Sequence, residues 1–249
     1  MKIYHEDATH IAGITLKNEQ KLEHNNMAFH VCEDEANVVT NRLALASTLQ
    51  VPLNRFVCAN QTHSANFYEV RQEDIGKGSY TMETAIEDTD ALYTYEPNIV
   101  LCSFTADCVP VLFYHEHTGL IGAIHSGWQG TVKEITEKML HHLIKEGNEA
   151  ENFRVYIGMA LSQEKFEVDE DVYEKFQALG YAEDFMYYKS ETNKYHIDNQ
   201  LTVQKQCERV GIPVENITLD RNCTFIDKSG FSYRENKRAG RHVSFIMRK

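Results

Sequence analysis

The stretch Ala123-Ile124-His125-Ser126-Gly127-Trp128-Gln129-Gly130-Thr131 joins an apolar run to an amphipathic run in a chain of 249 residues. The apolar run, residues 119–124, is typical of a buried strand. After Thr131, apolar residues recur at helical spacing as far as Leu143, which predicts a helix that stops near Gly147. The connection between strand and helix holds a histidine and the only tryptophan of the chain. Because a turn does not require a tryptophan, we regard this connection as a candidate site.

The elements on either side of this stretch predict the fold class. Apolar runs near 56–59, 67–70, 99–104, 109–114, 154–160 and 243–247 predict strands, and helical spacing predicts helices near 35–49, 169–179 and 199–210. Strands and helices do not alternate regularly, and no repeat or linker divides the chain. We therefore expect an α+β fold with mixed β-sheets flanked by helices, in one compact domain of residues 1–249.

Composition excludes several classes of function. The formal net charge of -12 argues against non-specific binding of nucleic acid, which requires a basic surface. No run of about 18 apolar residues predicts a membrane span, and Met1–Tyr4 do not begin a signal sequence, so we expect a cytoplasmic protein without a membrane partner. The six cysteines are irregularly spaced, which predicts free thiols in a reducing compartment.

Three residues of metal-ligand type, His63, Cys108 and His125, each lie in a polar turn at the end of an apolar strand. Two imidazoles and one thiolate would hold zinc with a fourth position open, as catalytic zinc sites require. Spacing leaves two alternatives open: a chance triple with a structural cysteine, or a Cys108 nucleophile with His125 as its base.

Arg42 lies on the apolar stripe of the helix predicted near 35–49, where a solvated arginine is not expected. Either its aliphatic stem covers apolar surface while the charge reaches water, or its guanidinium points into a site. In the second case its fork of donors would suit an oxyanion such as phosphate.

Three motifs in this order resemble the signature of the YfiH/YlmD family, whose members are also called laccase-domain or polyphenol oxidoreductase proteins. They are Asn60-Gln61-Thr62-His63-Ser64, Thr105–Phe113 around Cys108, and the opening stretch Ala123–Thr131. The likeness extends over nearly the whole chain. It departs from the family at Gln129, where members often carry arginine or lysine.

The resemblance implies an αββα-type sandwich and a zinc ion, rather than copper, held by His63, Cys108 and His125. It also implies phosphorolysis of purine nucleosides such as adenosine, inosine or guanosine, with related activities on methylthioadenosine and in adenosine deamination. The partners would be purine nucleosides and phosphate, bound to a monomer or homodimer. Candidate substrate contacts beside the metal are Arg42, Gln61, Asp107, Ser126 and Gly127, and Asp107 could alternatively orient a metal ligand.

Three other functions remain as alternatives. The first is a hydrolase or acyltransferase that uses Cys108 and His125. The second is a copper polyphenol oxidase, although the chain offers a single H-x-H pair, His115 and His117, in an expected turn. The third is a zinc-stabilised interaction domain. A cytidine-type deaminase signature and a P-loop are absent from the sequence.

Overall fold

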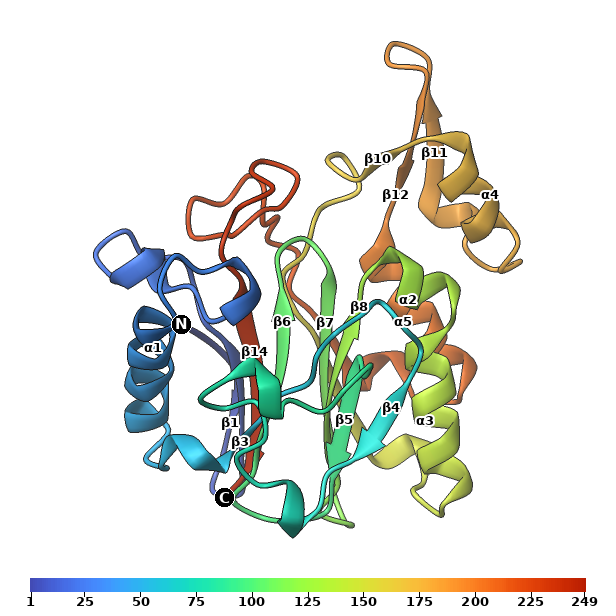
Figure 1. The fold of residues 1–249 in the computed structure, drawn as a ribbon. Coiled ribbons are helices and arrows are strands. Elements are labelled where there is room, and N and C mark those ends of the chain that lie inside the picture. Colours follow the sequence, from blue (N-terminus) through green and yellow to red (C-terminus); the bar gives the residue numbers. More distant parts are fainter.

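Two β-sheets lie face to face in the computed structural model, which describes residues 1–249, and helices cover their outer faces (Figure 1). The first sheet has the strand order β1 (Lys2–Glu6), β2 (His10–Ile14), β14 (His242–Arg248), β6 (Val100–Thr105) and β3 (Phe56–Val57). The second has the order β13 (Ile217–Leu219), β9 (Phe153–Ile157), β7 (Val109–His115), β8 (Ile121–Ser126), β5 (Ala91–Thr94) and β4 (Phe67–Glu69). Each sheet combines parallel and antiparallel pairs, which confirms the predicted α+β class with mixed sheets.

Helices form the two outer layers of the sandwich. Helix α1 (Glu35–Thr48) packs on the first sheet, and α2 (Trp128–Val132), α3 (Ile135–Lys145) and α5 (Asn199–Arg209) pack on the second (Figure 1). The start of α1 is fixed by Asp34, whose side chain accepts a 2.9 Å hydrogen bond from the backbone N–H of Ala36. No helix combines the length and the apolar character that a bilayer crossing requires.

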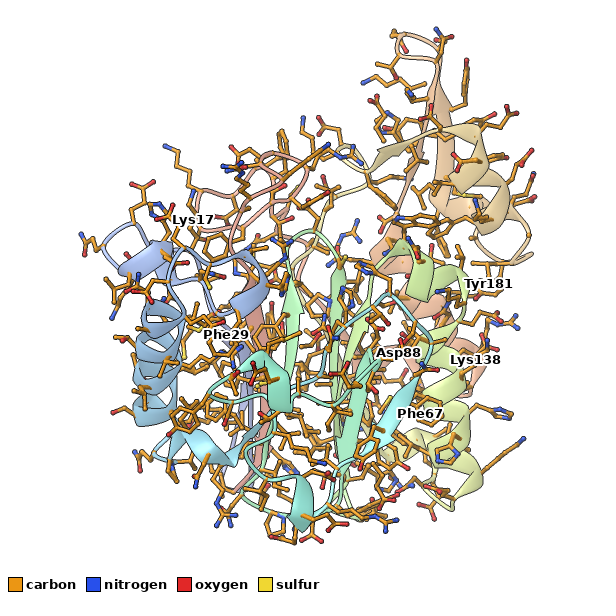
Figure 2. All side chains as sticks on the ribbon, in the orientation of Figure 1. Lys17, Phe29, Phe67, Asp88, Lys138 and Tyr181 are labelled. Carbon is orange, nitrogen blue, oxygen red and sulfur yellow. The ribbon has the colours of Figure 1, made fainter.

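The space between the sheets is filled by apolar side chains from both of them (Figure 2). Leu101 and Ile246 of the first sheet meet Leu112 and Ile121 of the second in one buried cluster. In strands buried on both faces, nearly every residue is apolar, which explains the continuous apolar runs of β6, β7 and β8. The sandwich therefore has three apolar layers, one between the sheets and one beneath each set of helices.

An arm extends beyond the sandwich between β9 and α5 (Figure 1). It consists of β10 (Glu167–Val168), α4 (Glu170–Gln177), β11 (Met186–Lys189) and β12 (Lys194–Ile197), and its three strands form a separate small sheet in the order β10-β12-β11. The arm has its own apolar cluster, which includes Phe166, Phe176 and Ile197.

The prediction of a single helix after Thr131 is wrong in one respect. Glu134 adopts a left-handed backbone conformation with φ of 59°, and the segment divides there into α2 and α3. Glutamate tolerates this conformation at a cost of about 1 kcal/mol or more, so tertiary packing must impose it. The apolar periodicity that continues through residues 132–143 conceals this break.

Replacing Leu112 by alanine is expected to lower the free energy of unfolding by about 2–5 kcal/mol, because this side chain is fully buried between the sheets. The matched control is Leu43→Ala on α1, where the side chain is 46% exposed and the expected change is within about 0.5 kcal/mol. Urea denaturation followed by circular dichroism measures both. Equal losses in the two variants would contradict this placement of the core.

Candidate metal centre

Two connections cross from the first sheet to the second at the same edge of the sandwich. The β3–β4 connection carries His63, and the β6–β7 connection carries Cys108. Because β3 and β6 are parallel neighbours, both connections leave the first sheet at the same edge. His125 is in β8, which runs antiparallel to β7 and therefore ends where β7 begins. The topology brings the three residues together from three separate parts of the chain.

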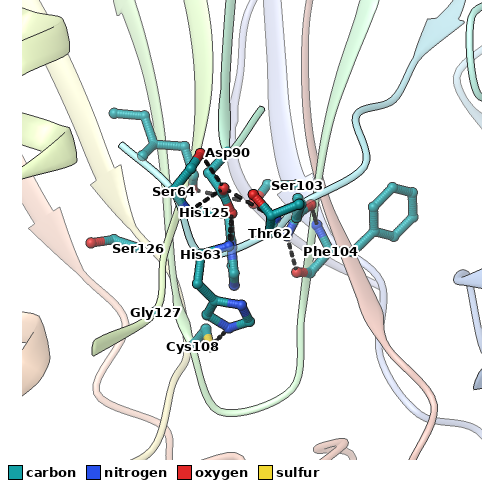
Figure 3. A network of polar contacts seen from close by, with 12 residues as sticks. Thr62, His63, Ser64, Asp90, Ser103, Phe104, Cys108, His125, Ser126 and Gly127 are labelled. Carbon is teal, nitrogen blue, oxygen red and sulfur yellow. Dashed lines mark hydrogen bonds and ion pairs between the residues drawn. The ribbon is translucent and has the colours of Figure 1, made fainter. Parts of the chain in front are cut away.

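The ligand atoms of His63, Cys108 and His125 all lie within 4.8 Å of one another (Figure 3). The sulfur of Cys108 is 3.9 Å from Nε2 of His63, and the two imidazole rings meet edge to face with centroids 4.8 Å apart. Zinc bonds of about 2.0–2.3 Å in tetrahedral geometry require ligand atoms of this order of separation. The donor set and its geometry fit a metal ion with three protein ligands.

Asp90, just before β5, forms hydrogen bonds that hold the residues of this cluster in place. Its carboxylate accepts a 2.7 Å hydrogen bond from Nδ1 of His125, which turns Nε2 of that ring toward Cys108 (Figure 3). The same carboxylate accepts from the backbone N–H groups of Thr62, His63 and Ser64 and from the Ser64 hydroxyl. Asp90 therefore holds the loop of one ligand and the ring of another.

The sequence analysis did not find Asp90. It ends a segment, residues 72–90, whose acidic and glycine-containing composition is typical of an exposed loop. The orienting role that was weighed for Asp107 belongs to Asp90 instead. The only signal in the sequence was that Asp90 directly precedes a buried strand, as Cys108 directly precedes another.

Electrostatics favour an anionic thiol beside a protonated imidazole. Burial alone would raise the pKa of Cys108, but the charges of His125 and His63 and their hydrogen bonds lower it to about 6. Burial would lower the pKa of His125, but the Cys108 thiolate and the Asp90 carboxylate raise it to about 9. For Asp90, the hydrogen bonds and charge of His125 and Ser64 outweigh burial and lower the pKa to about 2. A thiolate is the form that binds metals.

The backbone around the ligands is under local constraint. His63 and Asp107 both have left-handed conformations, with φ of 60° and 84°, at the two connections that cross between the sheets. Gly127 is needed for space, because a Cβ there would lie 2.7 Å from Cδ2 of His63 and 3.0 Å from the sulfur of Cys108. Any side chain at 127 would displace the ligands.

The cluster opens into a cavity of about 600 Å³. One wall is mainly apolar and comes from α2, the arm and the segment before it, with Trp128, Leu161, Phe166, Val168 and Val172, and the arm adds Asp169 and Asp171 to it. The opposite wall comes from the N-terminal and C-terminal segments, with His30, Tyr233, Arg234 and Arg241. This volume lies within the range of about 300–1,000 Å³ that is usual for small-molecule sites.

Of the five candidate substrate contacts, two line the cavity and three do not. Gln61 and Asp107 line the cavity, but the Gln61 amide exchanges two 2.8 Å hydrogen bonds with the Phe104 backbone. Asp107 accepts from the Thr224 hydroxyl and from the backbone N–H of Arg234, and so anchors the C-terminal segment.

The other three candidates lie behind the cavity wall. The Ser126 hydroxyl is fully buried and bonds to Thr131 at 2.9 Å, and Gly127 packs against the ligands. Arg42 is only 3% exposed and does not line the large cavity, so its charge does not reach solvent along the helix surface.

The H-x-H pair that a copper oxidase would use begins at His115, the last residue of β7, and ends at His117 in the turn before β8. His115 is buried, its Nδ1 accepts from the backbone N–H groups of His117 and Thr118, and its Nε2 faces the Glu149 carbonyl at 3.2 Å. Both ring nitrogens are therefore engaged with the backbone, away from the metal-ligand cluster.

Comparisons with known proteins agree with this architecture. Residues 11–249 match the family model described as multi-copper polyphenol oxidoreductase laccase. The chain belongs to this family. A Bacillus subtilis member described as purine nucleoside phosphorylase YlmD is 34% identical over 247 residues, which cover 95% of this chain and 87% of the relative.

Two further members bear on the site. A protein from an unknown prokaryotic organism, described as adenosine deaminase RL5, is 29% identical over 227 residues, covering 90% of this chain and 87% of the relative. The crystal structure of YfiH from Bacillus licheniformis superposes with a TM-score of 0.91 at 32% identity, covering 96% of this chain and 93% of that one. The family thus includes proteins named as nucleoside-processing enzymes.

Changing Asp90 to asparagine is expected to weaken metal binding by about 10- to 100-fold, because His125 and the loop of His63 lose their common acceptor. Competition with a chromogenic chelator measures the affinity. The matched control is Asp88→Asn, since Asp88 bonds to Thr62 and Asn66 in the same loop but not to a ligand ring. If both variants bound metal equally well, Asp90 would not be the orienting group.

Proposed function

We propose that this protein is a zinc-dependent purine nucleoside phosphorylase that cleaves adenosine, inosine or guanosine with phosphate. One observation carries the proposal: the His63, Cys108 and His125 cluster opens into a cavity whose lining combines apolar and aromatic side chains with two arginines, Arg234 and Arg241. The names of the curated relatives support the reaction class. Activities on methylthioadenosine and in adenosine deamination belong to the same proposal.

The apolar wall suits the flat face of a purine. Trp128 and Phe166 offer aromatic surface, and Val168 and Val172 extend it toward the arm. Burying a base against these side chains excludes water from one face of the nucleoside and directs its ribose toward the ligand cluster.

The basic wall attracts anions into a chain whose net charge is -12. Arg241 makes no ion pair with a carboxylate, and its guanidinium lies 5.8 Å from the Tyr233 ring. Burial lowers the pKa of Arg241, whereas the nearby Cys108 and Asp107 charges raise it. Arg234 is anchored by the carbonyls of Lys165 and Glu167, which ties the basic wall to the base of the arm.

Zinc fits the donor set better than copper or a hard cation, since a thiolate and two imidazoles are typical of zinc sites with an open position. His63 and His125 would bind through Nε2, and Cys108 through its thiolate. When bound, the ion would supply a Lewis acid at the floor of the cavity, which serves both phosphorolysis and hydrolytic deamination. Asp90 keeps Nδ1 of His125 protonated, so that Nε2 is free to act as a ligand.

A second candidate function rests on the same atoms. Cys108, His125 and Asp90 form a nucleophile, base and orienting acid of the kind found in cysteine hydrolases. In that function His63 would have no role, yet its Nε2 approaches the same sulfur at 3.9 Å. The second imidazole is the reason that we prefer a metal centre.

Activity is expected to require both zinc and phosphate. Purified protein loaded with zinc should convert inosine to hypoxanthine and a ribose phosphate, and a chelator or Cys108→Ser should lower the rate by at least about 100-fold. Cys32→Ser is the control, because this free thiol lies outside the cavity. Liquid chromatography of the released base measures the rate.

The same assay separates the alternatives. Adenosine supplied without phosphate should yield inosine if the deaminase activity is present. Loss of activity in Cys108→Ser with no dependence on metal would favour the cysteine hydrolase. Oxidation of a phenol that depends on bound copper would favour the oxidase. No product from any nucleoside at full zinc loading would contradict the proposed function.

A further inference from the structure

A second, smaller cavity of about 250 Å³ lies next to the large one. The two cavities share His30, Gln61 and Phe104 as lining residues, so they adjoin each other there. The nine residues that line the side cavity include Arg42 and no aspartate or glutamate. The side cavity is therefore a basic compartment beside the metal centre.

Arg42 carries a buried charge without a counter-ion. Its side chain is 3% exposed and forms no ion pair. The guanidinium lies between two aromatic rings, with its central carbon 4.2 Å from the centroid of Phe29 and 4.9 Å from that of Phe104 (Phe29 is labelled in Figure 2). Aromatic faces offset part of the cost of burying a cation, but an unpaired buried charge remains expensive.

A count of donors shows where Arg42 can still bind. A guanidinium has five N–H donors. Nε donates to the Met27 carbonyl at 2.8 Å, and Nη1 donates to the carbonyls of Gly78 and Ser79 at 2.7 and 2.9 Å. The two donors on Nη2 have no acceptor in the protein. Nη2 keeps some access to solvent, and Arg42 lines the side cavity but not the large one, so these two donors can serve a ligand in the side cavity.

His30 lies where the two cavities adjoin and can supply a further hydrogen-bond donor. Loss of hydration, followed by the positive charges of Arg241, His125 and Arg42, lowers the pKa of His30 to about 4. Positive groups from both cavities thus converge on this ring. A neutral His30 offers one N–H donor, and an anion placed beside it would relieve the repulsion between the surrounding cations.

We propose that the side cavity is the phosphate site, with inorganic phosphate accepting the two free donors of Arg42 Nη2 and a hydrogen bond from His30. This inference rests on the proposed phosphorylase function for the identity of the anion. The cavity volume is several times the share of about 30 Å³ that one water occupies, so a tetrahedral oxyanion has room. Where the two cavities adjoin, the phosphate would lie beside the ribose of a nucleoside in the large cavity.

The placement also balances the reaction. An oxygen of phosphate forms a bond to the anomeric carbon of the ribose, and the bond from that carbon to the purine nitrogen breaks. The electron pair of the broken bond leaves with the purine, which becomes the free base by taking up the proton that the attacking hydrogen phosphate loses. Arg42 and His30 bind and position the phosphate without taking part in bond making.

The decisive experiment blocks the side cavity without removing Arg42, which also anchors three carbonyls and whose loss can impair folding. Met82 is a half-buried lining residue on the surface turn Met82–Thr84, so Met82→Trp would fill the cavity from outside. Tyr80→Trp is the control, because Tyr80 is 49% exposed in the same loop and does not line the cavity. Arg42→Lys is the second test variant, and it keeps the charge but not the fork of donors.

Inorganic phosphate is titrated calorimetrically into the zinc-loaded proteins without nucleoside. We expect Met82→Trp and Arg42→Lys to bind phosphate about 10- to 100-fold more weakly than the natural chain, and Tyr80→Trp to bind it equally well. In the phosphorolysis assay the KM for phosphate should rise by the same factor, while the KM for inosine changes less than twofold.

Each outcome of these experiments either supports or contradicts the proposed phosphate site. Absence of phosphate binding to the natural chain, or equal binding to Met82→Trp, would show that the side cavity is not the site. If adenosine monophosphate but not phosphate lost affinity in Met82→Trp, the cavity would hold a nucleotide's phosphate and the assignment to free phosphate would be wrong. Failure of all nucleoside turnover would contradict the phosphorylase function, whereas the calorimetric comparison would still test the side cavity.

Discussion

The carboxylate of Asp90 is the interaction on which the metal centre depends. A buried carboxylate is unfavourable unless its oxygens are hydrogen-bonded, and five donors from the His63 loop and from His125 satisfy this one. The same bonds keep the backbone of His63 in a conformation that it would otherwise avoid. One buried charge thus stabilises a strained loop and orients a ring on a different strand.

The strand topology explains why His63, Cys108 and His125 meet at one edge of the sandwich. Two connections pass from the first sheet to the second at that edge, and each places a ligand at its midpoint or end. The strands next to Cys108 and around His125 are buried, so packed β-structure holds these two ligands, whereas Asp90 holds the loop that carries His63. Precise ligand placement follows from this, since the two sheets cannot shift without opening their common core.

Features with a strong local pattern could be predicted from the sequence. The continuous apolar runs predicted β6, β7 and β8, and the polar turns at strand ends predicted which side chains would meet at the site. The αββα arrangement and the expectation of zinc came from the family resemblance. Patterns with a period of 2 or 3.6 residues record burial, which is a local property of each element.

Features that depend on distant contacts could not be predicted. Asp90 lies in a segment whose composition is that of a surface loop, yet that segment passes inward and also supplies the Gly78 and Ser79 carbonyls that bind Arg42. The break at Glu134 leaves the apolar spacing intact. For Arg42, helical spacing showed that the side chain faces inward, but not that aromatic rings and carbonyls would surround it.

The arm has a consequence for how this architecture can diversify. It contributes Phe166, Val168 and Val172 to the apolar wall, yet it has its own small sheet and its own apolar cluster outside the sandwich. Substitutions in the arm therefore alter the shape of the wall while β8 and the β6–β7 connection, which carry His125 and Cys108, keep their own residues. Mutations in the arm can therefore change which small molecule the cavity binds while the His63, Cys108 and His125 cluster stays the same. Selectivity and chemistry can then evolve as separate traits.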